Sequence, residues 1–199
     1  RGSILNRRRR VSFPPAPTCF ARIYIGFRWP GGGTTAGLRF GITRAVPALE
    51  PVDESYFDLA PQRFSHSWSI AMPADAVWAE LVSERPLHWI RGLRIRWTSP
   101  RPFGVGTTRR AKTLGGLAVG DAYFFVWEEG GRQAFYFTRY NLPVFTSFAE
   151  DYVVEPVGTD GCRFTWRIAL TPTPFGRGPL NKLSFAYAFR ATGRYFNAA

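Results

Sequence analysis

The segment from Pro179 to Phe196, near the carboxyl end, constrains the fold more than any other part of the sequence. It follows a loop rich in proline and glycine, and Pro179 stands where a helix tolerates proline, in its first turn. Small or apolar side chains recur at helical spacing, first as a stripe and then as three phenylalanines that widen it: Leu180, Leu183, Ser184, Tyr187, Ala191, Phe185, Phe189 and Phe196. A helix with so wide an aromatic face needs an apolar surface to lie against. We therefore predict a long terminal helix that packs on a sheet formed by the preceding residues.

The composition fits one domain with a substantial core, because 45% of the 199 residues are hydrophobic and 17% are aromatic. The formal net charge of +12 predicts a positive surface that attracts phosphates, fatty-acid carboxylates and anionic membranes. Cys19 and Cys162 are the only cysteines, which argues against a disulfide scaffold and for a reducing, cytoplasmic compartment. No uncharged apolar run reaches the roughly 18–20 residues that cross a bilayer, so at most transient contact with a membrane surface is expected.

Residues 1–62 differ in character from the rest of the chain. They contain the basic run Arg7–Arg10, several prolines and the triplet Gly31–Gly33, and their short apolar pieces have no clear period. We expect an irregular or disordered extension here, followed by a folded domain over residues 63–199. Arg9 and Arg10 faintly match a twin-arginine export signal, but the prolines that follow interrupt an apolar core of such a signal.

The folded domain is predicted to consist of a strand, a helix, about six further strands and a long terminal helix. Alternating apolar and polar residues predict strands over residues 64–70, 93–97, 104–111, 118–128, 133–140, 146–155 and 162–170, and helices over 73–82 and 179–196. In the strand 118–128, strict alternation places Tyr123, Phe125 and Trp127 on one face and Ala122, Phe124 and Val126 on the other. Strands joined by short turns favour an α+β fold with an antiparallel sheet covered by helices on one face.

This ordering resembles the helix-grip fold of the START-like superfamily, which includes polyketide cyclases, plant pathogenesis-related proteins and lipid-transfer domains. The matching residues are the run 70–78 at the entry to the first helix, Gly104–Thr107 at the start of a strand, and Glu155-Pro156 with Gly161 around the last hairpin. The resemblance covers roughly residues 63–197. It implies a curved antiparallel sheet of about six or seven strands around the terminal helix, with an apolar cavity between them. It does not imply one reaction, because the superfamily contains both enzymes and passive carriers.

Aromatic side chains are the main candidates to line such a cavity. They are Trp89, Trp97, Phe125, Phe137, Tyr152, Trp166 and Tyr187, with His88 and Arg109 as secondary ligand contacts. Each ring also has the simpler interpretation that it fills the core. Glu150 is the catalytic candidate, because a carboxyl group in an apolar pocket can move protons; its alternative is a surface ion pair.

Motifs for metal or nucleotide chemistry are missing from the sequence. There are two histidines, His66 and His88, and no histidine–cysteine cluster, so we expect no metal and no cofactor. His66 lies in a strand among aromatic residues, where a structural role is expected. The arginines among aromatic residues do not form an RNA-binding signature, so we expect no nucleic-acid partner.

Two functions from different classes therefore stay open. The first is a module that binds an apolar small molecule, such as a lipid or a polyketide, and the second is a cyclase or dehydrase that uses the same cavity. The sequence favours binding, because no acid–base pair stands out. It leaves both a monomer and a homodimer open.

Overall fold

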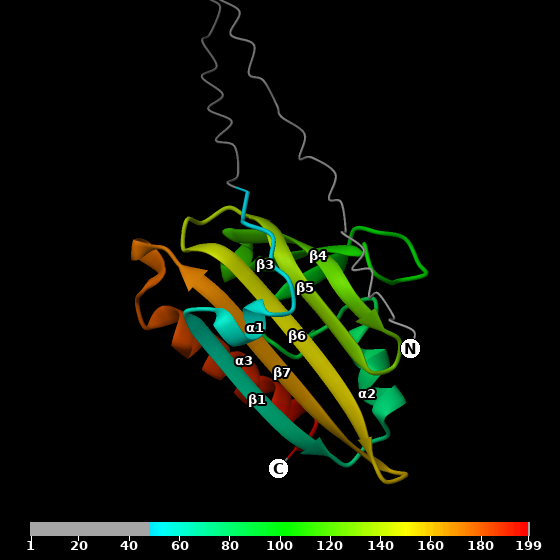
Figure 1. Ribbon diagram of the computed structural model, residues 1–199. Coiled ribbons are helices and arrows are strands. Elements are labelled where there is room, and N and C mark those ends of the chain that lie inside the picture. The colour runs from blue at the N-terminus through cyan, green and yellow to red at the C-terminus, as the bar shows by residue number, and fades with distance from the viewer. Residues whose placement is uncertain (1–47, 199) are drawn as a thin grey trace, which may run out of the picture. The chain divides into compact units, whose positions relative to one another are not determined.

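The computed structural model describes residues 48–198 (Figure 1). The elements follow one another as α1 (Tyr56–Leu59), β1 (Gln62–Ile70), α2 (Ala74–Leu81), β2 (Arg94–Trp97), β3 (Thr108–Thr113), η1 (Leu114–Gly116), β4 (Ala118–Glu128), β5 (Arg132–Tyr140), β6 (Phe145–Val157), β7 (Gly161–Pro172), η2 (Pro174–Gly176) and α3 (Leu180–Tyr195). The predicted strands and both predicted helices are present, with shifts of a few residues at their ends. Basic residues 7–10 and Cys19 lie outside the described residues.

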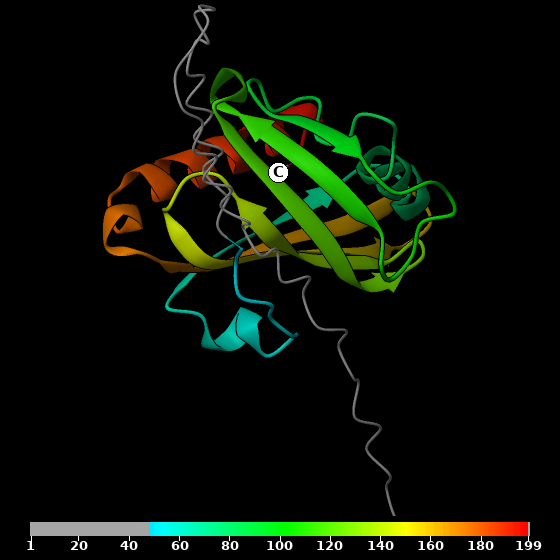
Figure 2. The same cartoon turned by 90° about the horizontal axis from the view of Figure 1, so that it is seen from above.

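The seven strands form one antiparallel sheet in the order β1-β7-β6-β5-β4-β3-β2. From β2 to β7 each strand pairs with the next along the chain, while β1 joins the far edge by pairing with β7 from Gln62↔Leu170 to Ile70↔Cys162. The sheet curls, and Figure 2 shows α3 on its inner, concave side and the short helix α1 on its outer, convex side. The predicted α+β helix-grip architecture is confirmed.

The main hydrophobic core fills the concave face. Strand alternation sends every second side chain to this face, and the rings of Phe124, Phe135, Phe148, Phe164 and Trp166 are all buried there. Helix α2 adds Val77, Trp78 and Leu81, which are its buried residues. The aromatic composition of the strands therefore appears in the structure as one continuous apolar layer beneath α3.

Residues 48–62, which we predicted to belong to the irregular extension, contribute to both faces of the sheet. Leu49 is buried in the concave core, and its backbone N–H donates to the carbonyl oxygen of Thr138. The next residue, Glu50, donates in the same way to Thr146. This short segment thus lies between the end of β5 and the start of β6, where these strands no longer pair directly. On the convex face, Phe57 of α1 is buried in a second, smaller cluster.

A β-bulge corrects the predicted faces of the strand β4. Phe124 pairs with Phe135 but Val126 pairs with Ala134, so Phe125 is an extra residue in the ladder. Trp127 consequently returns to the concave face beside Phe124, and the rings of these two residues are 5.3 Å apart. Strict alternation cannot anticipate this shift, because it assumes that each residue of one strand opposes one residue of its neighbour.

Helix α3 lies against the sheet, but with a different side from the predicted stripe. Phe185 packs on Phe64 and Phe148, and Phe189 packs on Trp68 and Trp166. The stripe residues Leu180, Leu183 and Tyr187 are instead exposed, by 74%, 63% and 44%. The three phenylalanines predicted to widen the apolar face thus form its packed centre, because their long rings reach the curved aromatic surface.

Candidate functional site

A buried arginine lies on the largely aromatic concave face. Arg109 on β3 is only 2% exposed, and its guanidinium carbon lies 3.9 Å from the centre of the Phe135 ring. The rings of Trp97, Phe124 and Tyr152 also lie within 6 Å of that carbon. These rings stabilise the cation through their π faces, by about 2 kcal/mol when the pair is desolvated. Their attraction does not replace hydrogen bonds to the guanidinium.

The hydrogen bonds of Arg109 are incomplete. Its Nη2 donates to the hydroxyl oxygen of Tyr152 at 3.3 Å, whereas Nε and Nη1 have no hydrogen-bond partner among the described residues. The side-chain amide of Gln133 is likewise buried with neither its nitrogen nor its oxygen paired. Buried polar groups are nearly always hydrogen-bonded in folded proteins, so two unsatisfied side chains on one face call for an explanation.

Tyr152 and Glu150 continue the polar cluster along β6. The hydroxyl of Tyr152 donates to Oε2 of Glu150 at 2.6 Å, and Nε1 of Trp166 on β7 donates to the same oxygen at 3.0 Å. Burial raises the pKa of the Glu150 carboxyl above its usual value, although the positive charge of Arg109 and the two hydrogen bonds act in the opposite direction. Burial and the neighbouring Glu150 also raise the pKa of Tyr152 well above its usual value.

The register of the sheet brings these residues together. Gln133 on β5 pairs with Tyr152 on β6, and Tyr152 pairs with Trp166 on β7. Side chains of directly paired residues lie on the same face of a sheet, so all three point to the concave face. Arg109 enters from β3, beside Ala122, whose small side chain leaves room for the guanidinium. The polar cluster is therefore assembled from the consecutive strands β5, β6 and β7 and from β3, which precedes them in the sequence.

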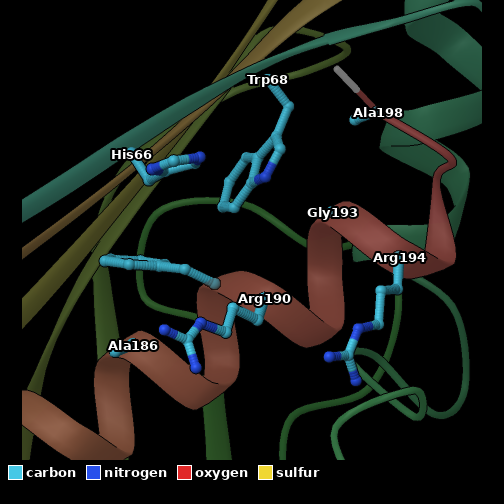
Figure 3. A pocket seen from close by; sticks show the side chains of 8 residues that line it. His66, Trp68, Ala186, Arg190, Gly193, Arg194 and Ala198 are labelled. Atoms are coloured by element: carbon cyan, nitrogen blue, oxygen red, sulfur yellow. The ribbon is translucent and has the colours of Figure 1, made fainter.

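An open pocket of about 440 Å³ lies between β1 and α3 (Figure 3). It is lined by His66, Trp68, Ala186, Phe189, Arg190, Gly193, Arg194 and Ala198. Helix and strand come close at Gly193, where an added Cβ would lie 2.9 Å from Nε1 of Trp68. The ring of His66 stacks near Phe189, in keeping with its expected place among aromatic residues.

Phe189 connects this pocket to the polar cluster. Its ring lies 5.4 Å from that of Trp166, edge to face, and Trp166 in turn donates to Glu150. A second open pocket, of about 340 Å³, lies beside Trp97 and Phe103 at the other edge of the sheet. Neither pocket is lined by Arg109, Glu150 or Tyr152. Arg109 and Tyr152 are buried beneath other side chains, and Glu150 is half-buried.

Four of the seven predicted ligand-contacting rings lie on the concave face near Arg109. Trp97 and Tyr152 are its direct neighbours, Trp166 binds Glu150, and Phe137 packs on Phe135. The catalytic candidate Glu150 and the secondary candidate Arg109 belong to the same cluster, linked through the Tyr152 hydroxyl.

The other three rings lie elsewhere. Phe125 faces the convex side, stacked on Phe57, because the alternation of β4 assigns Phe124 to the concave face instead. Tyr187 is on the outward side of α3. Trp89 stacks on Tyr195 and donates from Nε1 to Thr192, so it anchors the end of the helix.

His88 does not contact the cluster. Its side chain is 45% exposed, packs edge to face on Trp89 and Tyr195, and lies 4.0 Å from Glu80. Within residues 48–198 no three His, Cys, Asp or Glu side chains lie close enough together to hold a metal ion.

Sequence reasoning missed Phe124, Phe135 and Gln133. The signal for Gln133 was present, since it shares a strand face with Phe135 and Phe137, and a glutamine on a buried aromatic face is unusual. For Phe124 the periodicity correctly placed its side chain on the face opposite Phe125, but nothing in the sequence told which of these faces is concave.

The curved antiparallel sheet and the terminal helix define a START-like helix-grip fold, and solved structures agree with this class. A START superfamily protein from Mycobacterium smegmatis matches with a TM-score of 0.55 at 14% identity, over 68% of this chain and 97% of the other. The ginseng major latex-like protein 151 from Panax ginseng matches with a TM-score of 0.52 at 14% identity, over 68% and 97%. At this identity, the likeness concerns the fold alone.

The family follows from the sequence. The model of a family described as polyketide cyclase/dehydrase and lipid transport matches residues 61–196. Uncharacterized proteins of Mycobacterium tuberculosis and Mycobacterium bovis are 35% identical over 159 residues, which cover 75% of this chain and 93% of each relative. The chain belongs to the polyketide cyclase/dehydrase and lipid transport family, which confirms the resemblance drawn from the sequence. In residues 48–198, no helix combines the length and the apolar character that crossing a bilayer demands.

Proposed function

We propose that the protein binds an apolar small molecule with a hydrogen-bond-accepting end, such as a carboxylate or a carbonyl, and that Arg109 binds this end. The observation that carries the proposal is the buried guanidinium with two unpaired nitrogens. A carboxylate can accept two parallel N–H bonds from such a group, and these charge-assisted bonds are among the strongest in proteins. Membership of a family described as polyketide cyclase/dehydrase and lipid transport also supports an apolar ligand between the sheet and the helix.

The apolar part of the ligand would lie between the aromatic face and α3. The rings of Trp97, Phe124 and Phe135 offer flat, apolar walls next to the guanidinium. Because Arg109 and Tyr152 are buried, entry requires side chains or part of α3 to move. The open pocket beside His66 and Phe189 is the proposed route, since Phe189 lines it and packs on Trp166, and Trp166 donates to Glu150.

The first experiment is native mass spectrometry of the purified full chain, which detects a co-purifying small molecule. The second compares a long-chain fatty acid with the alcohol of the same length, using quenching of tryptophan fluorescence to measure Kd. Replacement of the guanidinium by an apolar side chain, Arg109→Met, is expected to weaken binding of the acid about 10- to 100-fold, because bonds to a charged group are worth about 1.5–3 kcal/mol.

The alcohol provides the internal control, and its Kd is expected to change little in Arg109→Met. The matched control variant is Arg110→Met, because Arg110 is the next residue of β3 but is exposed and pairs with Asp121 at 2.6 Å. Equal losses for acid and alcohol, or an unchanged Kd for the acid, would show that Arg109 does not hold the polar end of the ligand.

A second candidate function is catalysis of a cyclisation or dehydration in the same site. It is favoured by the raised pKa of Glu150 and by the hydrogen bond between Glu150 and Tyr152, since a carboxyl group that keeps its proton to a higher pH than usual can act as a general acid. Glu150→Gln separates the two functions. A carrier with this substitution keeps its affinity and has no turnover to lose, whereas an enzyme binds its substrate and stops converting it.

The remaining predictions concern location and partners. A cytoplasmic location, the absence of a nucleic-acid partner and a monomeric or dimeric state stay predictions from the sequence.

A further inference from the structure

The outward side of α3 carries an apolar surface that no part of the described chain covers. Leu180, Leu183 and Tyr187 are 74%, 63% and 44% exposed. Because successive residues of an α-helix are rotated by about 100°, these three side chains fall within an arc of about 60°. They lie opposite Phe185 and Phe189, which pack on the sheet. Exposed apolar residues that gather on one face indicate an interaction site more strongly than scattered ones.

The turn before α3 carries a further exposed apolar side chain. Phe175 in η2 is 84% exposed, yet its turn is held firmly. The backbone N–H of Gly176 donates to Thr173, and the side chain of Asn181 donates to the carbonyl oxygen of Gly176 at 2.8 Å. Gly176 also packs so closely on Val144 that an added Cβ would overlap the Val144 carbonyl oxygen. A fixed turn therefore presents a bare phenylalanine beside the first turn of α3.

The carboxyl-terminal segment that carries this surface has charged side chains of one sign only. Residues 161–199 contain no aspartate or glutamate and six basic residues. Four of these six, Arg177, Lys182, Arg190 and Arg194, are exposed in η2–α3. By helical rotation, Arg190 and Arg194 fall on the same outward side as Tyr187. Apolar side chains followed by cations on one helix face match the layers of an anionic bilayer, where acyl chains lie beneath negative headgroups.

We propose that the outward side of α3, together with Phe175, docks on the surface of an anionic phospholipid bilayer. A second copy of the chain is a poorer match, because each copy carries a net charge of +12 and pairing would bring two basic faces together. Docking would orient the open pocket between β1 and α3 near the lipid, since Arg190 and Arg194 line that pocket as well. The docking proposal is independent of the proposed function, because it requires no ligand inside the protein.

The test is co-sedimentation of the full chain with vesicles of phosphatidylcholine alone or mixed with phosphatidylglycerol. We expect binding to the mixed vesicles, weakened by salt. The double variant Leu180→Ser/Leu183→Ser is expected to bind them about tenfold more weakly, because apolar insertion is lost. Arg190→Gln/Arg194→Gln is expected to weaken binding and to reduce its dependence on salt.

The matched control is Leu59→Ser. Leu59 is 76% exposed, like Leu180, but belongs to α1 on the opposite side of the sheet (Figure 2), so its loss should leave vesicle binding unchanged. The basic run at residues 7–10 carries charge of its own, so the comparison between variants decides, and not binding by the wild type alone. Circular dichroism checks that each variant is folded.

Two outcomes overturn the proposal. The first is a double leucine variant that binds the mixed vesicles as well as the Leu59→Ser control. The second is light scattering that shows a dimer in the wild type and a monomer in the double variant, because the leucines would then be covered by a second copy. Fatty-acid affinity measured without vesicles tests Arg109 alone, so failure of one proposal is distinguishable from failure of the other.

Discussion

Two neighbouring carboxylates on β6 lie in opposite environments. Glu150 points to the concave face and Asp151 to the convex face, where its side chain is completely buried. Asp151 forms ion pairs with Arg132 and Arg167, and both arginines hold it through more than one hydrogen bond. Phe57 of α1 lies over Arg167, 5.1 Å from its guanidinium carbon. The convex cluster is thus paired and closed.

The concave cluster also contains an arginine and a carboxylate, but its hydrogen bonds are incomplete. Glu150 receives bonds from Tyr152 and Trp166, whereas Arg109 reaches it only through the Tyr152 hydroxyl and keeps two unpaired nitrogens. Breaking a fully paired buried ion cluster leaves unpaired charges in the interior, so the convex cluster has a structural role. The incompletely bonded cluster on the concave face is the one that the proposed ligand would complete. Under that proposal, the difference in pairing separates a structural arginine–carboxylate cluster from a ligand-binding one.

The largest expected effect is on the convex side. Asp151→Asn leaves the positive charges of Arg132 and Arg167 without a buried counter-charge, and we expect a loss of about 3–5 kcal/mol in the free energy of unfolding. Urea denaturation followed by tryptophan fluorescence measures it. Arg109→Met is the counterpart on the concave side, where removing an incompletely bonded charge should cost much less. Comparable losses in the two variants would remove the distinction between the clusters.

A smaller effect is expected from the pH dependence of Glu150. Its pKa is raised in the folded state, so the folded protein holds this proton more tightly than the unfolded chain does. The contribution to stability is therefore fully present below the usual carboxyl pKa of 4.5 and is lost as the pH rises through the raised value. Glu150→Gln cannot ionise at this position and should not show this decline.

The measurement compares free energies of unfolding for wild type and Glu150→Gln over a pH series that starts below pH 4.5. The wild type should lose stability relative to the variant as the pH increases. Glu155→Gln, at an exposed position of the same strand, serves as the control. A difference that stays constant with pH, or that grows in favour of the wild type, would contradict the burial of an ionisable Glu150.

The smallest effect is expected at the rim of the convex cluster. Glu54 binds Arg132 at 2.8 Å, but its side chain is 60% exposed, so solvent screens the pair. Glu54→Gln should therefore lower the free energy of unfolding by less than about 0.5 kcal/mol. A loss close to that of Asp151→Asn would mean that the segment before α1 stabilises the convex face far more than its exposure indicates.

Much of the site followed from strand patterns. Glu150 and Tyr152 were correctly placed on one face because they stand two residues apart in an uninterrupted strand. The contact between Arg109 and Tyr152 was not predicted. Strands β3 and β6 are separated in the sheet by β4 and β5, so the two side chains come together only because the sheet curls. Phe125 was assigned to the ligand-binding face because a local pattern does not show to which side the sheet will curl.

The sequence by itself determined the strand and helix order, the alternation along strands without a bulge and the family, because these depend on local periodicity and on short motifs. Tertiary structure alone decided which side of α3 meets the sheet. That helix carries apolar residues on two sides, Phe185 and Phe189 on one and Leu180 and Leu183 on the other. The curved layer of rings beneath selects the side whose aromatic side chains interlock with it. The leucines are then left at the surface, where we propose that lipid meets them.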